Sequence, residues 1–142
     1  MKILFKPQTE WLPPQDFPDL SKYDEIAIDL ETKDPNLNKR MGSGSVVGEG
    51  DVVGISLATY DWCAYYPIAH EGGGNMDRKM VLKWLQDQLN TPATKIFHNA
   101  MYDVCWLRAL GLKINGKIVD TMIAASLVDE NRFRYDLNGC GR

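Results

Sequence analysis

The sequence predicts an α/β fold in which helices flank a mixed β-sheet. Three strand-like segments precede the first helix, and the second and third of them (52–60 and 62–68) are separated only by Asp61, which indicates an antiparallel hairpin. After this hairpin, helical and strand-like segments alternate, as is typical of parallel strands joined by crossover helices. The length of 142 residues fits one domain.

The N-terminal segment, residues 1–22, is rich in proline. We expect a short strand at Ile3–Phe5 and, for the rest, an irregular arm on the surface. The first clear strand is Tyr23–Leu30, because Ile26 and Ile28 alternate with less apolar residues. The main domain is therefore expected to run from residue 23 to residue 142.

A long connection, Thr32–Asp51, follows this strand. Its glycines Gly42, Gly44 and Gly48 do not have the spacing of a dinucleotide-binding or Walker motif, and a strand follows them instead of a helix. We therefore interpret this connection as a flexible loop, although loops of this length are often functional.

The segment Asp77–Leu89 has the spacing of an amphipathic helix, with Asn75 or Asp77 able to cap its start. The residues expected on its buried face are Met80, Val81, Trp84, Leu85 and Leu89. The remaining predicted elements are a short buried strand at Lys95–His98, a helix at Tyr102–Leu110 ended by Gly111, a strand at Lys117–Val119, and a helix at Asp120–Val128 with Asp120 as its cap.

Composition excludes several classes of protein. No apolar run approaches the ~20 residues of a membrane span, and no secretory signal begins the chain, so we expect a cytoplasmic protein without membrane contact. Cys63 and Cys105 lie among apolar residues and are expected in the core. A net charge of −3 argues against a broad basic surface for nucleic acid, but it is compatible with carboxylates that bind metal ions.

The strongest chemical signal is the pair Asp29 and Glu31 at the end of the first strand. Residues two apart on a strand point the same way, so both carboxylates are expected on one face. Like charges placed so closely repel each other unless a cation lies between them, and hard oxygen ligands suit Mg²⁺ or Mn²⁺.

A second signal is the pair Asn99 and Asp103. Asn99 follows a buried strand and is expected to cap the next helix, with Asp103 one turn later on the same face. Ends of central strands are where α/β sheets place their sites. His98 beside them is expected to be a buried, hydrogen-bonded neighbour, whereas His70 is expected on the surface. Trp84 and Trp106 have core spacing.

Taken together, these segments resemble the first two exonuclease motifs of the DEDD superfamily, and within it the proofreading 3′-5′ exonuclease domain of family A DNA polymerases, in particular phage-type members. The matching segments are Ile28–Thr32 (IDLET), Phe97–Asp103 (FHNAMYD), Asp29–Leu37 (DLETKDPNL), His70–Asn75 (HEGGGN) and Val119–Met122 (VDTM). The resemblance extends from Tyr23 to Leu137.

This resemblance implies a ribonuclease H-like fold, incomplete at the C-terminus, that uses two Mg²⁺ or Mn²⁺ ions. It implies that Asp29, Glu31 and Asp103 are the catalytic and metal-binding residues, and that the backbone of Thr32 and the side chain of Asn99 contact the terminal nucleotide. The implied function is proofreading: hydrolysis of phosphodiester bonds at single-stranded DNA 3′ ends by two-metal-ion catalysis. The implied partner is a polymerase domain that follows in the full-length protein, in the host cytoplasm if a phage encodes it.

The sequence departs from the family at its third motif, Tyr-x-x-x-Asp or His-x-x-x-x-Asp. Tyr135 and Asp136 are adjacent, which is the wrong spacing, and Asp129 is expected to be a solvated cap. A chain truncated before that motif is the simplest interpretation, with metal affinity and turnover far below those of an intact domain. The alternatives are a catalytically impaired domain that only binds nucleic acid or acts as a scaffold, and an RNA-trimming exonuclease of the ribonuclease D type.

Overall fold

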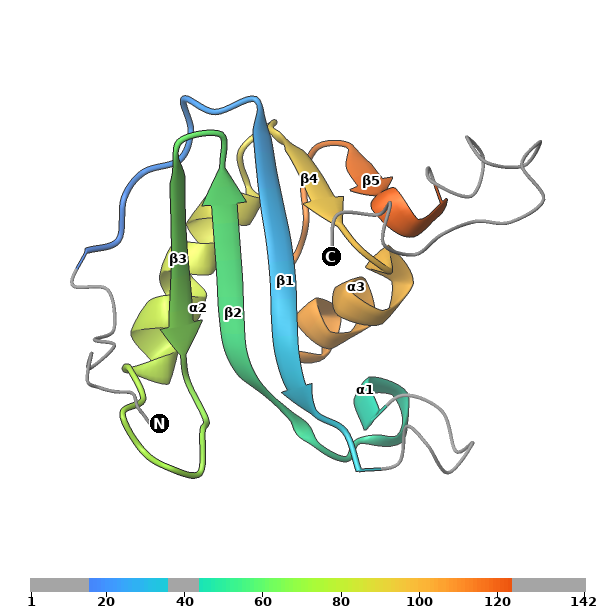
Figure 1. Ribbon diagram of the computed structural model, residues 1–142. Helices are drawn as coiled ribbons and strands as arrows, with labels where there is room; N and C mark the ends of the chain where they lie inside the picture. The colour runs from blue at the N-terminus through green and yellow to red at the C-terminus, as the bar shows by residue number, and fades with distance from the viewer. Residues whose placement is uncertain (1–15, 36–43, 124–142) are drawn as a thin grey trace, which may run out of the picture.

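The computed structural model describes residues 16–35 and 44–123, and Figure 1 shows the arrangement of their elements. Five strands form a single sheet in the order β3-β2-β1-β4-β5. The elements are β1 (Glu25–Lys33), α1 (Gly44–Val47), β2 (Asp51–Thr59), β3 (Trp62–Pro67), α2 (Arg78–Leu89), β4 (Thr94–Phe97), α3 (Ala100–Ala109) and β5 (Ile118–Asp120).

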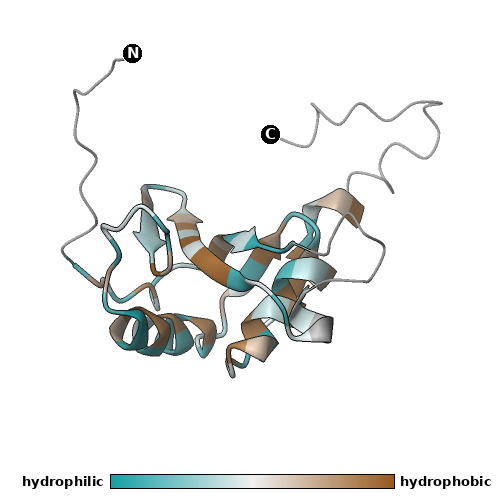
Figure 2. Cartoon of the chain, turned by 90° about the horizontal axis from the view of Figure 1, so that it is seen from below, coloured by the Kyte–Doolittle hydropathy of each residue, from teal (hydrophilic) through white to brown (hydrophobic). Residues whose placement is uncertain are grey.

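The sheet is mixed, as the sequence predicts. β2 pairs antiparallel with both β1 and β3, whereas β4 pairs parallel with β1 and β5. Helices α2 and α3 lie behind the sheet in Figure 1, and Figure 2 shows both on the same side of it. Because both long helices cover one face, the other face of the sheet stays open over the part of the chain that the structure describes. No helix among the described residues is long and apolar enough to cross a membrane.

Helix α2 begins at Arg78, one residue after its predicted start, and Asp77 caps it as predicted. The Asp77 carboxylate accepts hydrogen bonds from the backbone N–H groups of Lys79 (3.0 Å) and Met80 (3.3 Å). The buried face holds Val81, Trp84, Leu85, Gln88 and Leu89. The prediction for Met80 was wrong, since its side chain is 55% exposed. The buried stripe runs in steps of three and four from Val81, and the preceding position is rotated out of it.

The described part of the N-terminal segment packs more tightly than a surface arm. It has no helix or strand, as predicted, but Leu20 is only 1% exposed. The backbone N–H of Leu20 donates to Gln88 Oε1 (2.8 Å), and Trp84 Nε1 donates to the carbonyl of Pro18 (2.8 Å). These bonds attach the segment to helix α2, so the expectation of a surface arm was wrong for residues 18–20. The strand predicted at Ile3–Phe5 lies outside the described residues.

Strand β1 begins two residues later and ends three residues later than predicted, so Glu31 and Thr32 lie within it. Pairing with β2 continues to Lys33, and the register shifts between Glu31 and Thr32, which marks a β-bulge. Bulges re-aim the side chains beside them. The connection after β1, expected to be a flexible loop, contains the short helix α1. The Asp34 carboxylate accepts from the N–H of Gly44 at the start of this helix (2.9 and 3.0 Å).

The strand register decides which side chains share the open face. On β1, Ile26, Ile28 and Leu30 belong to the buried core, so the alternate residues point to the other side. The cross-strand pairs on that other side are Ala27 with Ala58, Asp29 with Ser56, Glu31 with Gly54, Ser56 with Tyr65, and Ala58 with Cys63. Cys63 lies on this open face and is exposed, so the expectation of a core cysteine was wrong, whereas Cys105 is half-buried.

Candidate active site

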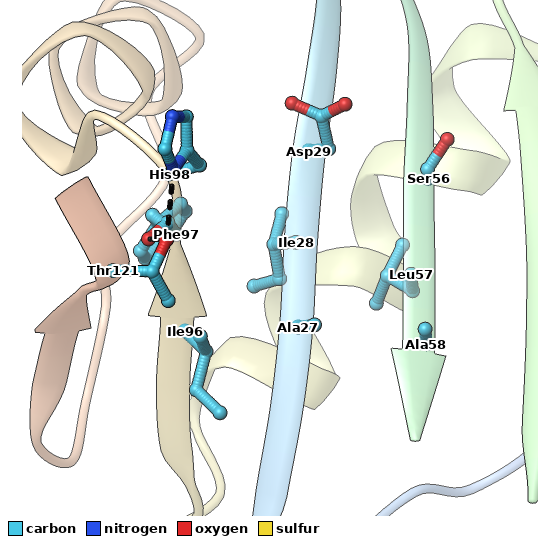
Figure 3. Close-up of a pocket in the computed structure, with 10 residues that line it drawn as sticks. All are labelled: Ala27, Ile28, Asp29, Ser56, Leu57, Ala58, Ile96, Phe97, His98 and Thr121. Atoms are coloured by element: carbon cyan, nitrogen blue, oxygen red, sulfur yellow. Dashed lines mark hydrogen bonds between the residues drawn. The ribbon is translucent and has the colours of Figure 1, made fainter. Parts of the chain in front are cut away.

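A cavity of ≈ 430 Å³ opens on the uncovered face of the sheet. Figure 3 shows its lining residues on β1, β2, β4 and the segment after β5, with Asp29, Ser56, His98 and Thr121 as the polar ones. The floor between them is apolar, since Ala27, Ala58 and Ile96 also contribute. Asp29 therefore presents its carboxylate at the rim of a cavity on the central strand.

Asp103 lies in the first turn of α3, where its carboxyl is buried (the residue is 4% exposed). Its Oδ2 atom has no hydrogen-bond partner among the described residues. Burial, the charge of Asp29 and the charge of Asp120 together raise the pKa of Asp103 to about 7, although a backbone hydrogen bond from Leu30 opposes the shift. A buried carboxyl oxygen without a partner is rare and calls for a compensating group.

The pairing of Asp29 with Asp103 fits a cation. The two carboxylates come from β1 and α3, and the charge of Asp29 disfavours ionisation of Asp103 unless a positive charge lies between them. Oxygen ligands of this kind suit Mg²⁺ or Mn²⁺. Over the described ranges, however, no three His, Cys, Asp or Glu side chains are grouped closely enough to hold a metal ion. Of the three predicted carboxylates, Asp29 and Asp103 are thus close enough for the charge of one to act on the other.

Glu31 is held by a tyrosine from β3. The hydroxyl of Tyr65 donates to Glu31 Oε1 (2.6 Å) and also bonds His70 Nε2, which lies 3.8 Å from the same carboxylate oxygen. Burial and the Glu31 carboxylate raise the pKa of Tyr65, so its hydroxyl keeps its proton. His70 is half-buried in this contact and is not the free surface residue that the sequence suggested.

Asn99 occupies the N-cap position of α3 but does not cap it. Its side chain makes no capping bond, and its backbone adopts the left-handed conformation (φ 71°) that asparagine tolerates better than most residues. The cap comes from Asp120, whose carboxylate accepts from the N–H groups of Asn99 (3.0 Å) and Ala100 (2.9 Å). The predicted capping role of Asn99 was therefore wrong: its side chain is exposed and makes no capping bond.

Asp120 also accepts from the N–H of Met122 (3.0 Å), so it caps the helical turn after β5 as predicted. The described part of that helix ends at Ile123, and the rest of the predicted helix lies outside the described residues. Desolvation raises the pKa of Asp120, but the hydrogen bonds that its carboxylate accepts from backbone N–H groups outweigh this effect, so the pKa is lowered. One carboxylate thus fixes the start of two helices.

Thr32 and His98 complete the neighbourhood. Thr32 Oγ1 lies 2.8 Å from the hydroxyl of Tyr102, which also donates to Asp34 Oδ2 (2.9 Å). His98 Nδ1 lies 2.9 Å from Thr121 Oγ1, so His98 is hydrogen-bonded as predicted, but it is half-buried where the sequence predicted a buried residue. The tyrosine contacts of the site were not predicted, because they depend on register and on packing between distant segments.

The residues considered for the third motif, Asp129, Tyr135 and Asp136, lie outside the described residues. Trp84 and Trp106 are in the core as predicted.

Comparisons with known proteins identify the family of this chain. A family described as 3′-5′ exonuclease matches residues 15–138. DNA polymerase DpoZ of Acinetobacter phage SH-Ab 15497 is 30% identical over 125 residues, which are 86% of this chain and 17% of that protein. A DNA-directed DNA polymerase of Pseudomonas phage M6 is 30% identical over 135 residues, which are 91% of this chain and 20% of that protein. The chain thus spans about a fifth of the length of these relatives.

Solved structures share the fold. Brucella melitensis NrnC superimposes with a TM-score of 0.55 at 22% identity, covering 85% of this chain and 52% of NrnC. The exonuclease domain of Aedes aegypti Nibbler gives a TM-score of 0.55 at 16% identity, covering 83% of this chain and 53% of that domain. At these identities the likeness shows the architecture alone: a ribonuclease H-like mixed sheet with helices.

Proposed function

This chain belongs to the family of 3′-5′ exonuclease domains related to those of family A DNA polymerases, and on that premise we propose that it removes nucleotides from the 3′ ends of single-stranded DNA as the proofreading part of a DNA polymerase. The observation that carries the proposal is the buried, unpartnered carboxyl oxygen of Asp103 beside Asp29. Asp29 itself lines a cavity on the uncovered face of the sheet, where a strand end has room to approach.

In the proposed site, Asp29, Glu31 and Asp103 would hold two Mg²⁺ or Mn²⁺ ions. Such ions, when bound, supply an activated water and stabilise the leaving oxygen. Asp29 projects from β1 and Asp103 from α3, so rigid elements hold the carboxylates on two sides. The backbone of Thr32 and the exposed side chain of Asn99 would contact the terminal nucleotide, and its base would bind against the apolar cavity floor.

The test is a nuclease assay with single-stranded DNA labelled at its 5′ end, in Mg²⁺ or Mn²⁺ and with excess protein. We expect stepwise shortening from the 3′ end, abolished by EDTA and by Asp29→Asn. Asp87→Asn is the matched control, because Asp87 is an exposed carboxylate on helix α2, away from the site. An RNA strand of the same sequence distinguishes the ribonuclease D type of activity.

A second measurement does not depend on turnover. Mn²⁺ binding followed by electron paramagnetic resonance should be weakened by Asp29→Asn and by Asp103→Asn, and left unchanged by Asp87→Asn. The proposal is contradicted if the wild-type chain neither shortens DNA nor binds Mn²⁺. It is also contradicted if Asp29→Asn changes neither property.

A further inference from the structure

We propose that Tyr65 and His70 are positioning residues for Glu31: they hold one oxygen of its carboxylate so that the other faces the cation. This inference rests on the proposed function and deepens it. The carboxylate in question is on a side chain that is 57% exposed, where a free glutamate would sample several rotamers. Groups that hydrogen-bond a ligating carboxylate fix its direction, and their loss commonly weakens metal binding.

The strand register shows that Tyr65 reaches Glu31 across an intervening strand. Glu31 on β1 is paired with Gly54 on β2, and Tyr65 on β3 is paired with Ser56, the next residue of β2 on the same face. The ring of Tyr65 must therefore pass diagonally over Gly54 to place its hydroxyl 2.6 Å from Glu31 Oε1.

Gly54 makes this passage possible. A Cβ atom at this position would lie 1.8 Å from the Tyr65 hydroxyl oxygen and 2.2 Å from the ring carbon that carries it. The backbone of Gly54 is not in the left-handed region, so conformational freedom does not explain the glycine. A glycine in a strand interior often marks a close approach by another group, and here that group is the tyrosine ring.

His70 is itself held in place by the turn that follows it. Asn75 Oδ1 accepts from the backbone N–H of His70 (2.7 Å), and Asn75 Nδ2 donates to the carbonyl of His70 (2.9 Å). The turn between them is closed by Gly73 and Gly74, both with positive φ. This reciprocal pair explains why the Gly-rich segment, which contains no phosphate-binding motif, ends in asparagine.

Hydrogen-bond arithmetic assigns the donors. A tyrosine hydroxyl carries one proton, and an ionised carboxylate only accepts. If Tyr65 donates to Glu31, then His70 Nε2 must carry a proton and donate to the Tyr65 oxygen. The opposite arrangement, with Tyr65 donating to an unprotonated Nε2, would leave Glu31 without its donor. The tautomer of His70 in the metal-free chain therefore reports directly on the arrangement.

The experiment has two arms. In the metal-free chain, ¹⁵N NMR of His70 at a pH where it is neutral should show a protonated Nε2, and Tyr65→Phe should shift the ¹³Cδ resonance of Glu31. In the second arm, Mn²⁺ binding should weaken about tenfold or more in Tyr65→Phe. Gly54→Ala should weaken it to a similar degree by displacing the ring, and the double variant should be no worse than Tyr65→Phe alone.

Tyr66→Phe is the matched control, since it removes the hydroxyl of the adjacent tyrosine, which is buried on the other side of β3 and bonds the carbonyl of Asp16. Its Mn²⁺ affinity should equal that of the wild type. His70→Gln, which retains an N–H donor, should keep more affinity than His70→Ala.

Two results would overturn the inference alone: an unprotonated Nε2 on His70, or equal Mn²⁺ affinity in the wild type and a folded Tyr65→Phe. A wild-type chain that binds no Mn²⁺ at all would instead overturn the proposed function, and this inference with it.

Discussion

Asp29 on the central strand lies close enough to Asp103, in the first turn of α3, for its charge to act with burial in raising the pKa of Asp103 to about 7. In the metal-free chain this is an unfavourable arrangement. The folded state holds a proton on Asp103 between its ordinary pKa of 3.8 and about 7, where the unfolded chain has released it.

The first prediction concerns stability against pH. Because the folded state binds more protons in that window, the free energy of unfolding of the metal-free protein should fall as pH rises from about 4 to about 7, and stay low above it. Asp103→Asn removes this term, so it should raise stability at pH 8 by on the order of 1–2 kcal/mol, or a few degrees in Tm. Thermal unfolding of both proteins in EDTA at pH 5 and pH 8 measures the effect. A wild-type Tm that rises across this range, with no gain from Asp103→Asn, would contradict it.

The second prediction concerns metal removal. A cation that neutralises Asp29 and Asp103 binds only the folded state, so Mn²⁺ should raise Tm. At a Mn²⁺ concentration a hundred times the dissociation constant, the free energy of unfolding should increase by about 2.7 kcal/mol. The gain should be larger at pH 8 than at pH 5.5, because protonation of Asp103 competes with the metal. Differential scanning fluorimetry with Mn²⁺ and with EDTA tests this. Asp29→Asn serves as the comparison, in which the metal-dependent gain should disappear.

The third prediction separates the backbone role of Asn99 from any contact with a nucleotide. The left-handed conformation at this position costs an alanine roughly 1 kcal/mol or more, and glycine nothing. Asn99→Ala should therefore lower stability by about that amount in urea unfolding, while Asn99→Gly should stay close to the wild type. If the side chain also contacts substrate, both variants should raise the KM for single-stranded DNA equally. Equal stability of the two variants would show that the backbone conformation is not what selects asparagine.

The fourth prediction concerns Asp120, which caps two helices. Asp120→Ala removes the acceptor of three backbone N–H groups, those of Asn99, Ala100 and Met122, and should cost about 2 kcal/mol of stability. Asp120→Asn keeps one acceptor oxygen and should cost about half as much. Since the pKa of Asp120 is lowered, its contribution is present above the ordinary aspartate pKa of 3.8 and is lost as pH falls below it. The loss in the alanine variant should accordingly shrink at pH 3.

The order of the main strands and helices and the mixed character of the sheet followed from the sequence, because they depend on local periodicity and on connection lengths. The strand order β3-β2-β1-β4-β5 and the helix α1 were not predicted. Helix α2 illustrates this: its cap Asp77 and four of its five expected core residues are confirmed. The predicted end of β1 was wrong, because pairing with β2 extends the strand through Lys33 and no local sequence pattern shows that pairing. Of the site, the carboxylates on one strand face were predictable from alternation.

The contacts around those carboxylates were not predictable from the chain itself. The bond between Tyr65 and Glu31 spans three strands and requires the register of both pairings. The bond from Asn99 to Asp120 joins residues twenty-one positions apart across two parallel strands. Sequence could show that each of these residues is polar and near an element end, but only tertiary structure shows which of them touch.

The gap at Gly54 has a consequence for anyone who engineers this domain. Glycine weakens a strand interior, so procedures that rank substitutions by folding stability will select a larger residue at this position. Its first methyl group would nevertheless take the place of the tyrosine hydroxyl, and the loss would be visible only when the protein is asked to bind its ion or degrade a strand.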